Sequence, residues 1–166
     1  MILKGKVWKF GDDINTDVIY PGKYLAIFEP EEMAKHCFET VYPDFLKKLK
    51  KGDIIVAGKY FGCGSSREQA ATCLKYAGIG CIIAESFARI YYRNAINQGL
   101  PILICPGISK KIEQGHTIEV DIASGSIKNL TTGEKIQASR LPEFILEIIS
   151  DGGLIPYVKK KLKRNV

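Results

Sequence analysis

The segment from residue 61 to residue 68, Phe-Gly-Cys-Gly-Ser-Ser-Arg-Glu, holds the residue types of this chain that are best suited to binding and chemistry. Its glycines, Gly62 and Gly64, let the backbone come close to a ligand. Ser65 and Ser66 supply two hydroxyls, and Arg67 supplies a guanidinium. A guanidinium is a planar, two-pronged donor that matches a carboxylate. If a helix follows, its first amides and the positive end of its dipole point at the same place. The segment therefore predicts an anion site.

Other kinds of site fit this segment less well. A phosphate loop needs Lys followed by Ser or Thr, and a serine-hydrolase elbow needs Gly-x-Ser-x-Gly. Cys63 stays open as a nucleophile, because a helix start lowers the pKa of a thiol. Ser65 or Ser66 can also cap the helix, with Glu68 nearby. Capping alone leaves the two glycines and Arg67 without a role, whereas anion binding accounts for all of them.

The elements that must position this segment alternate in type along the middle of the chain. Short β-branched runs predict strands at 53–57, 81–84 and 100–105, and good helix formers predict helices at 67–77 and 87–98. Strand–helix–strand–helix–strand at this spacing is a right-handed βαβαβ unit on a parallel sheet. Segment 61–68 then lies at the carboxyl end of a parallel strand, where open α/β sheets bind their ligands.

The flanking regions complete an α/β fold with an antiparallel β section. We expect strands at 2–10, 117–123, 126–130 and 135–138, turns at 11–17, and helices at 30–38, 43–50 and 142–150. Residues 18–28 hold either a strand and turn or a mobile loop. The predicted organisation is one domain, 1–158, followed by a basic C-terminal tail, 159–166, that forms a short helix or a frayed end.

Composition narrows the classes of function. The net charge of +6 comes mainly from the tail, because without its five basic residues the chain has 19 basic and 18 acidic residues. Nucleic acid is therefore not an expected partner. We see no secretory signal and no apolar run of membrane-spanning length, and the five cysteines predict a reducing cytoplasm. With no Cys-x-x-Cys and two histidines, no metal site is expected on this chain. The acids of 12–17 lack the spacing of a calcium loop.

Three sets of motifs make the chain resemble one family. Residues 62–68 look like the serine loop of the aconitase superfamily. The runs at 86–90, 93–95 and 98–101 look like its second signature, and 12–17 with Tyr24-Leu25 resembles the start of its small subunits. The resemblance is collinear from about residue 4 to residue 157. It identifies the chain with the small subunits of isopropylmalate dehydratase and homoaconitase, and implies a swivelling β/β/α domain.

The resemblance also implies roles for the residues of the serine loop. Ser65 would be the base, an alkoxide that takes a proton alpha to a carboxylate. Ser66 and Gly64 would bind the substrate. Arg67 would stabilise both the Ser65 alkoxide and the substrate carboxylate. A [4Fe-4S] cluster is implied on a large partner subunit, with none on this chain, in a heterodimer or heterotetramer. Position 69 departs from the family pattern, because this chain has Gln69 where the family often has His. The contact that the histidine ring would make is therefore in doubt.

The resemblance places the substrate's variable end against a flexible loop after Tyr24. In the family, an Arg in this loop is found with substrates whose variable end is a carboxylate, and small apolar residues are found with substrates whose variable end is an alkyl group. In this chain the loop positions are Leu25, Ala26 and Ile27. A buried core strand at 24–28 is the alternative. The loop interpretation favours an alkyl malate, so we expect interconversion of 2-isopropylmalate and 3-isopropylmalate in leucine biosynthesis. Homoaconitate or 2,3-dimethylmalate dehydration, or a non-catalytic organic-acid-binding module, are the alternatives.

Overall fold

One curled sheet of seven strands runs through the structure, a computed structural model that describes residues 1–164. Its strands are β1 Ile2–Lys9, β2 Ile54–Ala57, β3 Cys81–Ala84, β4 Ile102–Ile104, β5 Thr117–Asp121, β6 Ser126–Asn129 and β7 Lys135–Gln137. They lie in the order β4-β3-β2-β1-β5-β6-β7. The half from β4 to β1 is parallel, and the half from β1 to β7 is antiparallel. The predicted α/β class, with a parallel βαβαβ core and an antiparallel section, is confirmed.

Strand β1 joins the two halves. Its first part pairs antiparallel with β5, and its last part, from Val7 onward, pairs parallel with β2. The buried Asp53 carboxylate fixes this junction by accepting hydrogen bonds from the Lys6 amide (3.2 Å), the Trp8 indole (3.0 Å) and the Lys50 amide (3.0 Å). A single carboxylate thus sets the start of β2 beside β1.

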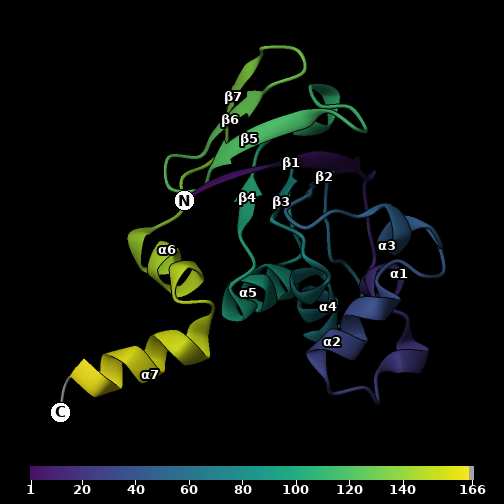
Figure 1. Cartoon of the computed structure of the whole chain (residues 1–166), viewed down its shortest axis with the longest axis vertical. Helices are drawn as coiled ribbons and strands as arrows, with labels where there is room; N and C mark the ends of the chain where they lie inside the picture. The colour runs from purple at the N-terminus through teal and green to yellow at the C-terminus, as the bar shows by residue number, and fades with distance from the viewer. Residues whose placement is uncertain (165–166) are drawn as a thin grey trace.

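The helices fall on one side of the parallel half and at the end of the chain (Figure 1). They are α1 Thr16–Ile19, α2 Pro30–Met33, α3 Phe45–Lys48, α4 Gln69–Ala77, α5 Arg89–Gln98, α6 Glu143–Ser150 and α7 Leu154–Arg164. Helices α4 and α5 end as predicted, at Gly78 and Gly99, whose φ of 100° and 71° only glycine adopts at low cost. Both helices begin at the carboxyl edge of the sheet, so their N-termini point toward the same region.

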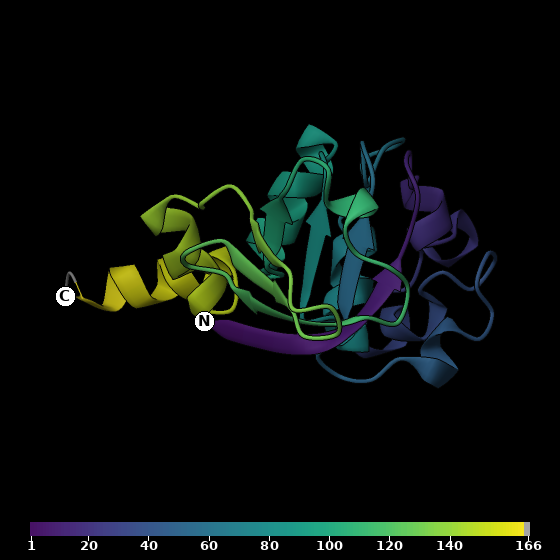
Figure 2. The ribbon, with the colours of Figure 1, turned by 90° about the horizontal axis from the view of Figure 1, so that it is seen from above.

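Alternate residues of the parallel strands face two different cores. Ile55 and Ile82 pack with α4, α5 and the segment 10–50, whereas Ile54 and Ile83 pack with the apolar side chains of β5 to β7. Burial on both faces explains why these strands read as continuous hydrophobic runs. Figure 2, a view from above, shows the antiparallel strands lying across the parallel half.

Three segments differ from what the sequence predicted. Helix α4 begins at Gln69 and not at 67, so Arg67 and Glu68 belong to the serine loop and not to the helix. Residues 24–28 form no strand: a 3₁₀ turn over Gly22–Tyr24 leads into irregular chain, so the core-strand alternative is wrong. The helix expected at 30–38 is broken into α2 and a 3₁₀ turn over Ala34–His36.

The basic end of the chain lies on α7, which projects away from the body beside α6 (Figures 1 and 2). This helix runs through residue 159, the predicted start of the tail, and residues 165–166 lie outside the described part. Among the described residues, no helix has the length and apolar character needed to cross a membrane.

Candidate functional site

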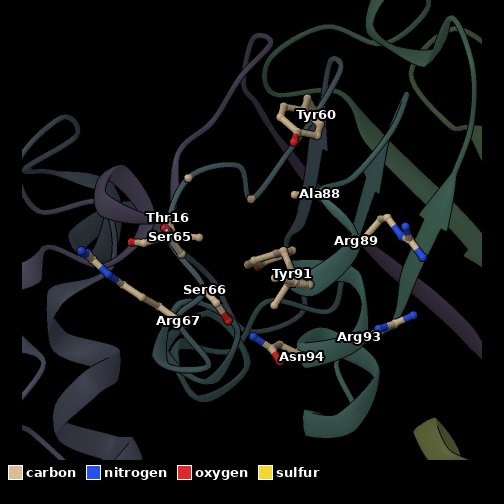
Figure 3. Close-up of a pocket in the computed structure, with 13 residues that line it drawn as sticks. Thr16, Tyr60, Ser65, Ser66, Arg67, Ala88, Arg89, Tyr91, Arg93 and Asn94 are labelled. Carbon is tan, nitrogen blue, oxygen red and sulfur yellow. The ribbon is translucent and has the colours of Figure 1, made fainter.

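The serine loop forms one wall of a pocket of about 510 Å³ at the carboxyl edge of the parallel strands. Its lining comes from α1, the loop after β2 and the first turns of α5: Thr16, Tyr60, Gly62, Gly64, Ser65, Ser66, Arg67, Ala88, Arg89, Ile90, Tyr91, Arg93 and Asn94. The lining includes three arginines and no carboxylate. Figure 3 shows the loop and α5 on opposite sides of this pocket. Its charge therefore suits an anion, as the sequence predicted.

Gly62 and Gly64 are required by the path of the loop. Both have positive φ, 80° and 89°. A Cβ on Gly62 would overlap the Tyr91 ring, and one on Gly64 would lie 2.6 Å from the amide oxygen of Asn15. The glycines thus let the loop pass between α1 and α5, and they bring its backbone to the edge of the pocket.

The two serine hydroxyls are exposed and have no hydrogen-bond partner among the described residues. The loop is held by its backbone instead: the Thr16 hydroxyl donates to the Ser65 carbonyl, and the Thr16 amide donates to the Cys63 carbonyl, both at 2.8 Å. The N-cap of α4 is Glu68, which makes no side-chain cap bond. Capping by a serine is therefore wrong, and both hydroxyls stay available to a ligand.

The Arg67 guanidinium is held by Asp17. It pairs with that carboxylate and also donates to the Tyr20 carbonyl at 3.4 Å. In Figure 3 the guanidinium points to the side away from the Ser66 hydroxyl, which points toward the side where Asn94 lies. Sequence reasoning missed Asp17 as a partner, although the residue stands in the N-terminal motif. The contact joins residues 50 positions apart, and no local spacing predicts it.

The first turns of α5 supply the opposite wall. Arg89 and Arg93 are four residues apart, as are Ile90 and Asn94, so both pairs lie on one side of the helix. The sequence motifs included these residues without giving them a role in the site. Their i,i+4 spacing, together with the position of α5 after β3, was the signal that could have found them.

Cys63 does not have the environment of a nucleophile. Burial, with the nearby Asp13 carboxylate second, raises the pKa of its thiol above the ordinary value. A raised pKa keeps the thiol protonated at neutral pH, and only the thiolate attacks. The alternative of a cysteine nucleophile is therefore not supported.

The predicted substrate loop leaves the site beside Arg67. A Cβ on Gly22 would lie 3.5 Å from the Arg67 guanidinium and from the Asp17 carboxylate. Three residues later, Leu25 and Ala26 are exposed, and Ile27 packs against the core. None of Leu25, Ala26 and Ile27 lines the pocket, so the structure of this chain does not bring them to the serines. Gln69, the first residue of α4, does not line it either.

The base of this loop is anchored by Glu39. Its carboxylate accepts hydrogen bonds from the Tyr24 hydroxyl (2.7 Å) and Lys23 (3.3 Å), and pairs with the His36 ring at 2.7 Å. The Tyr24 ring stacks on His36 with 3.6 Å between ring centroids. The Tyr24 hydrogen bond, followed by that of His36, lowers the pKa of Glu39 to about 2. The residues before Leu25 are thus held, while Leu25 and Ala26 remain in solvent.

The described residues offer no group of three His, Cys, Asp or Glu side chains that could hold a metal ion. Four of the five cysteines are buried in the cores, and none forms a disulfide. The cysteines therefore do not converge on the pocket, and a metal cluster does not fit the donors of this chain.

Comparison with known proteins places these features in a family. The family model of the aconitase C-terminal domain matches residues 39–106, which contain the serine loop and all of α5. The isopropylmalate/citramalate isomerase small subunit of Methanocaldococcus jannaschii is 58% identical over 97% of this chain and 96% of its own. The 3-isopropylmalate dehydratase small subunit of Caldicellulosiruptor bescii is 53% identical over 99% of both chains.

A solved structure agrees with this likeness. The crystal structure of a 3-isopropylmalate dehydratase chain from Methanocaldococcus jannaschii superposes with a TM-score of 0.94 and 45% identity. The superposition covers 99% of this chain and 98% of that one. Sequence and fold thus point to the same group of proteins over nearly the full length.

Proposed function

The chain belongs to the family of 3-isopropylmalate dehydratase small subunits, hydro-lyase subunits of the aconitase type, and from that premise we propose how its site works. We propose that the serine loop binds a carboxylate of an alkyl malate and removes the proton alpha to it, while a large subunit completes the enzyme. The observation that carries the proposal is the pair of free hydroxyls, Ser65 and Ser66, at an uncapped helix start in a pocket with three arginines.

Ser65 is the proposed base. A serine oxygen can take this proton only as the alkoxide, and the high pKa of the hydroxyl keeps it protonated in water; a nearby positive charge lowers that pKa and favours the alkoxide. The amides at the start of α4 and the Arg67 guanidinium supply that charge on this chain. The Ser65 alkoxide takes the proton from the substrate carbon and returns to the hydroxyl form, and the electron pair of the broken C–H bond stays on the carbon alpha to the carboxylate. Ser66 and the backbone at Gly64 hold the substrate carboxylate, so that the reacting carbon stays in reach.

Asp17 positions Arg67 in this proposal. The pairing fixes the guanidinium of Arg67, a side chain that is only 15% exposed, and leaves its other donors free for an anion. The substrate carboxylate and the developing alkoxide compete for those donors. Asp17 thus sets where the positive charge lies before substrate arrives.

The iron–sulfur cluster that the family implies belongs to the large subunit in this proposal, since the donors of this chain do not fit it. When bound there, it supplies the Lewis acid for the hydroxyl that leaves and returns. This chain's own part is limited to binding and orienting the carboxylate and to moving one proton. The five cysteines without disulfides support a reducing compartment, and we place the enzyme in the cytoplasm.

The proposed substrates are 2-isopropylmalate and 3-isopropylmalate, interconverted by loss and return of water in leucine biosynthesis. The loop after Tyr24 presents Leu25 and Ala26, which carry no cation to neutralise a third carboxylate. A carboxylate moved from water into such surroundings without a partner is strongly disfavoured, whereas an alkyl group is favoured. The name of the Methanocaldococcus relative, with both isopropylmalate and citramalate, supports a substrate that varies in its alkyl group.

The test is reconstitution with the cognate large subunit. We expect the purified chain alone to show no hydro-lyase activity. Mixing it with the cluster-loaded large subunit should give dehydration of 2-isopropylmalate, followed as formation of the carbon–carbon double bond. Citramalate, dimethylmalate and homoaconitate are compared in the same assay. Turnover by this chain alone after metal removal would contradict the proposal, and so would an assembled enzyme that ignores all alkyl malates.

A further inference from the structure

Four residues outside the pocket form what we call the Glu39 clamp: Lys23, Tyr24, His36 and Glu39. The two oxygens of the Glu39 carboxylate serve two different segments of chain. Oε1 accepts hydrogen bonds from Tyr24 and Lys23, and Oε2 lies 2.7 Å from Nδ1 of His36. The clamp therefore ties the turn over Gly22–Tyr24 to the turn over Ala34–His36.

The position of Glu39 is fixed by the residue before it. Phe38 is fully buried and has a φ of 55°, in the left-handed region that residues with a Cβ seldom adopt. Its ring stacks on Phe10 with 4.5 Å between centroids, and its amide donates to the Ile19 carbonyl at 2.9 Å. Such a backbone persists only where the surrounding packing holds it. Glu39 thus leaves the core at a fixed point, with its side chain 36% exposed.

The turn that the clamp holds lies against the Arg67 guanidinium. The Tyr20 hydroxyl donates to the Tyr24 carbonyl at 2.9 Å, and the Tyr20 carbonyl accepts from Arg67 at 3.4 Å. Between these two residues, a Cβ on Gly22 would lie 3.5 Å from each terminal nitrogen of the guanidinium. In Figure 3 the guanidinium points toward the purple ribbon of the N-terminal segment. A continuous series of contacts therefore joins Glu39 to Arg67 through Tyr24 and Tyr20.

The turn is needed because Asp17 holds the guanidinium at one nitrogen. In the described part of the chain, the hydrogen bonds to Asp17 and to the Tyr20 carbonyl both start from Nη1 of Arg67. A planar group that is bound through one nitrogen to an exposed carboxylate can still pivot about that contact. The backbone of the turn limits this pivot. Orientation matters for a planar donor, and a small misplacement of a group that contacts the substrate lowers the rate of reaction.

We propose that Glu39 is a positioning residue for Arg67, because it holds the turn over Gly22–Tyr24 against the guanidinium. The proposal rests on the proposed function, in which Arg67 stabilises the substrate carboxylate and the Ser65 alkoxide. When the clamp is broken, the turn moves away and the guanidinium keeps Asp17 as its partner but loses its fixed orientation. Substrate binding and proton transfer then both weaken, although Glu39 itself lies outside the pocket.

The first test observes Arg67 directly in the isolated chain. Side-chain NMR measures how fast its guanidinium protons exchange with water, and the Arg67 signal is identified by its loss in Arg67→Lys. We expect Glu39→Ala to accelerate this exchange at least about fivefold, since the turn opens. Glu32→Ala is the matched control, because it removes a paired carboxylate outside the clamp and should leave the rate near wild type. An exchange rate that Glu39→Ala leaves unchanged would overturn the proposal.

The second test follows the same contacts in the assembled enzyme. Glu39→Ala should lower kcat/KM for 2-isopropylmalate by about tenfold. Glu39→Gln, which keeps an oxygen for the Tyr24 hydroxyl, should lose less. Tyr24→Phe keeps the ring on His36 and removes only the hydroxyl. Combined with Glu39→Ala it should add less than about twofold, because both changes break one series of contacts. Losses that multiply in the double variant would show that Glu39 does not act through Tyr24.

The two tests separate this proposal from the proposed function. If the assembled wild type is active and Glu39→Ala keeps the wild-type kcat/KM and exchange rate, positioning by Glu39 is wrong and the proposed function stands. If the assembled wild type turns over no alkyl malate, the proposed function is wrong. The exchange rates of the isolated chain then still decide whether Glu39 positions Arg67.

Discussion

The Ser65 hydroxyl is exposed and makes no hydrogen bond within the described chain, so its removal tests chemistry with little effect on folding. We expect Ser65→Ala in the assembled enzyme to lower kcat by about 10²-fold or more, the usual contribution of a positioned base. The Tm should stay within about 1–2 °C of wild type, because no cap bond is lost. Thr16→Ser, which keeps the hydroxyl that holds the loop, is the control. An enzyme with Ser65→Ala that retains most of its kcat would show that the loop is structural.

Glu39 is the residue whose titration reports on the base of the substrate loop. Its pKa is lowered to about 2, first by the Tyr24 hydroxyl and then by His36. A lowered pKa means that the stabilisation by Glu39 is full above the ordinary value, near 4.5, and is lost as the pH falls toward 2. Carboxyl NMR titration should give a midpoint near 2. Tyr24→Phe should return the midpoint toward 4.5, and an unchanged midpoint would mean that the hydrogen bond is absent in solution.

Lys75 links three elements through one ammonium group. It donates to the Gln98 carbonyl at the end of α5 and, at 2.8 Å, to the Gly152 carbonyl before α7. We expect Lys75→Met to destabilise the fold by about 1–3 kcal/mol, because it leaves the helix end without its charged donor. Chemical denaturation measures this value. Lys159→Met on α7, whose ammonium makes no hydrogen bond in the described structure, should change it by less than about 0.5 kcal/mol.

The loop after Tyr24 is where we expect substrate preference to be set. Ala26→Arg adds a cation where a tricarboxylate would need one, so it should narrow or reverse the preference for isopropylmalate over homoaconitate. The measured quantity is the ratio of kcat/KM for the two substrates in wild type and variant. Ala26→Leu keeps the loop apolar and serves as control. An unchanged ratio with Ala26→Arg would show that the loop does not reach the variable end of the substrate.

Local elements with strong sequence signals were predicted well. The β-branched runs became β2 and β3, and the glycines at 78 and 99 ended α4 and α5 as expected. What depended on distant contacts was not predicted. The pairing of Arg67 with Asp17 and the division of β1 between β2 and β5 each join segments about 50 or more residues apart. Nothing in the spacing of nearby residues encodes such contacts.

The serine loop was found from its residue types, because glycine, serine and arginine before a helix have a chemistry of their own. The α5 wall was missed for the opposite reason. Arg89 and Arg93 look like ordinary exposed helix residues, and only the start of α5 beside the loop makes them part of the pocket. For the end of the chain the sequence predicts either a short helix or a frayed tail, because its basic run, three consecutive lysines followed by Leu162 and Lys163, favours neither.

The whole molecule should unfold as one unit. Strand β1 is shared by both halves of the sheet, and the Met1 carbonyl accepts a 3.0 Å hydrogen bond from the Ile122 amide. If one half of the sheet unfolds, the other half loses the strand pairing that β1 provides. Calorimetry should therefore show a single transition with equal calorimetric and van't Hoff enthalpies. Deleting residues 1–5 should lower the Tm of that one transition. Two resolved transitions would show that the parallel and antiparallel halves are independent.

The place of β1 also determines how the chain must behave while it is being synthesised. β1 leaves the ribosome well before β5, its antiparallel neighbour, which begins only at Thr117. Until β5 to β7 emerge, Ile54, Val56 and Ile83 lack the side chains that cover them in the finished protein. A nascent chain with its parallel half complete therefore exposes an apolar sheet face to the cell, as partly folded chains that need chaperones do. The exposure lasts at least until β5 to β7 have been made. Because long-range strand pairing of this kind also forms slowly, folding adds to that interval.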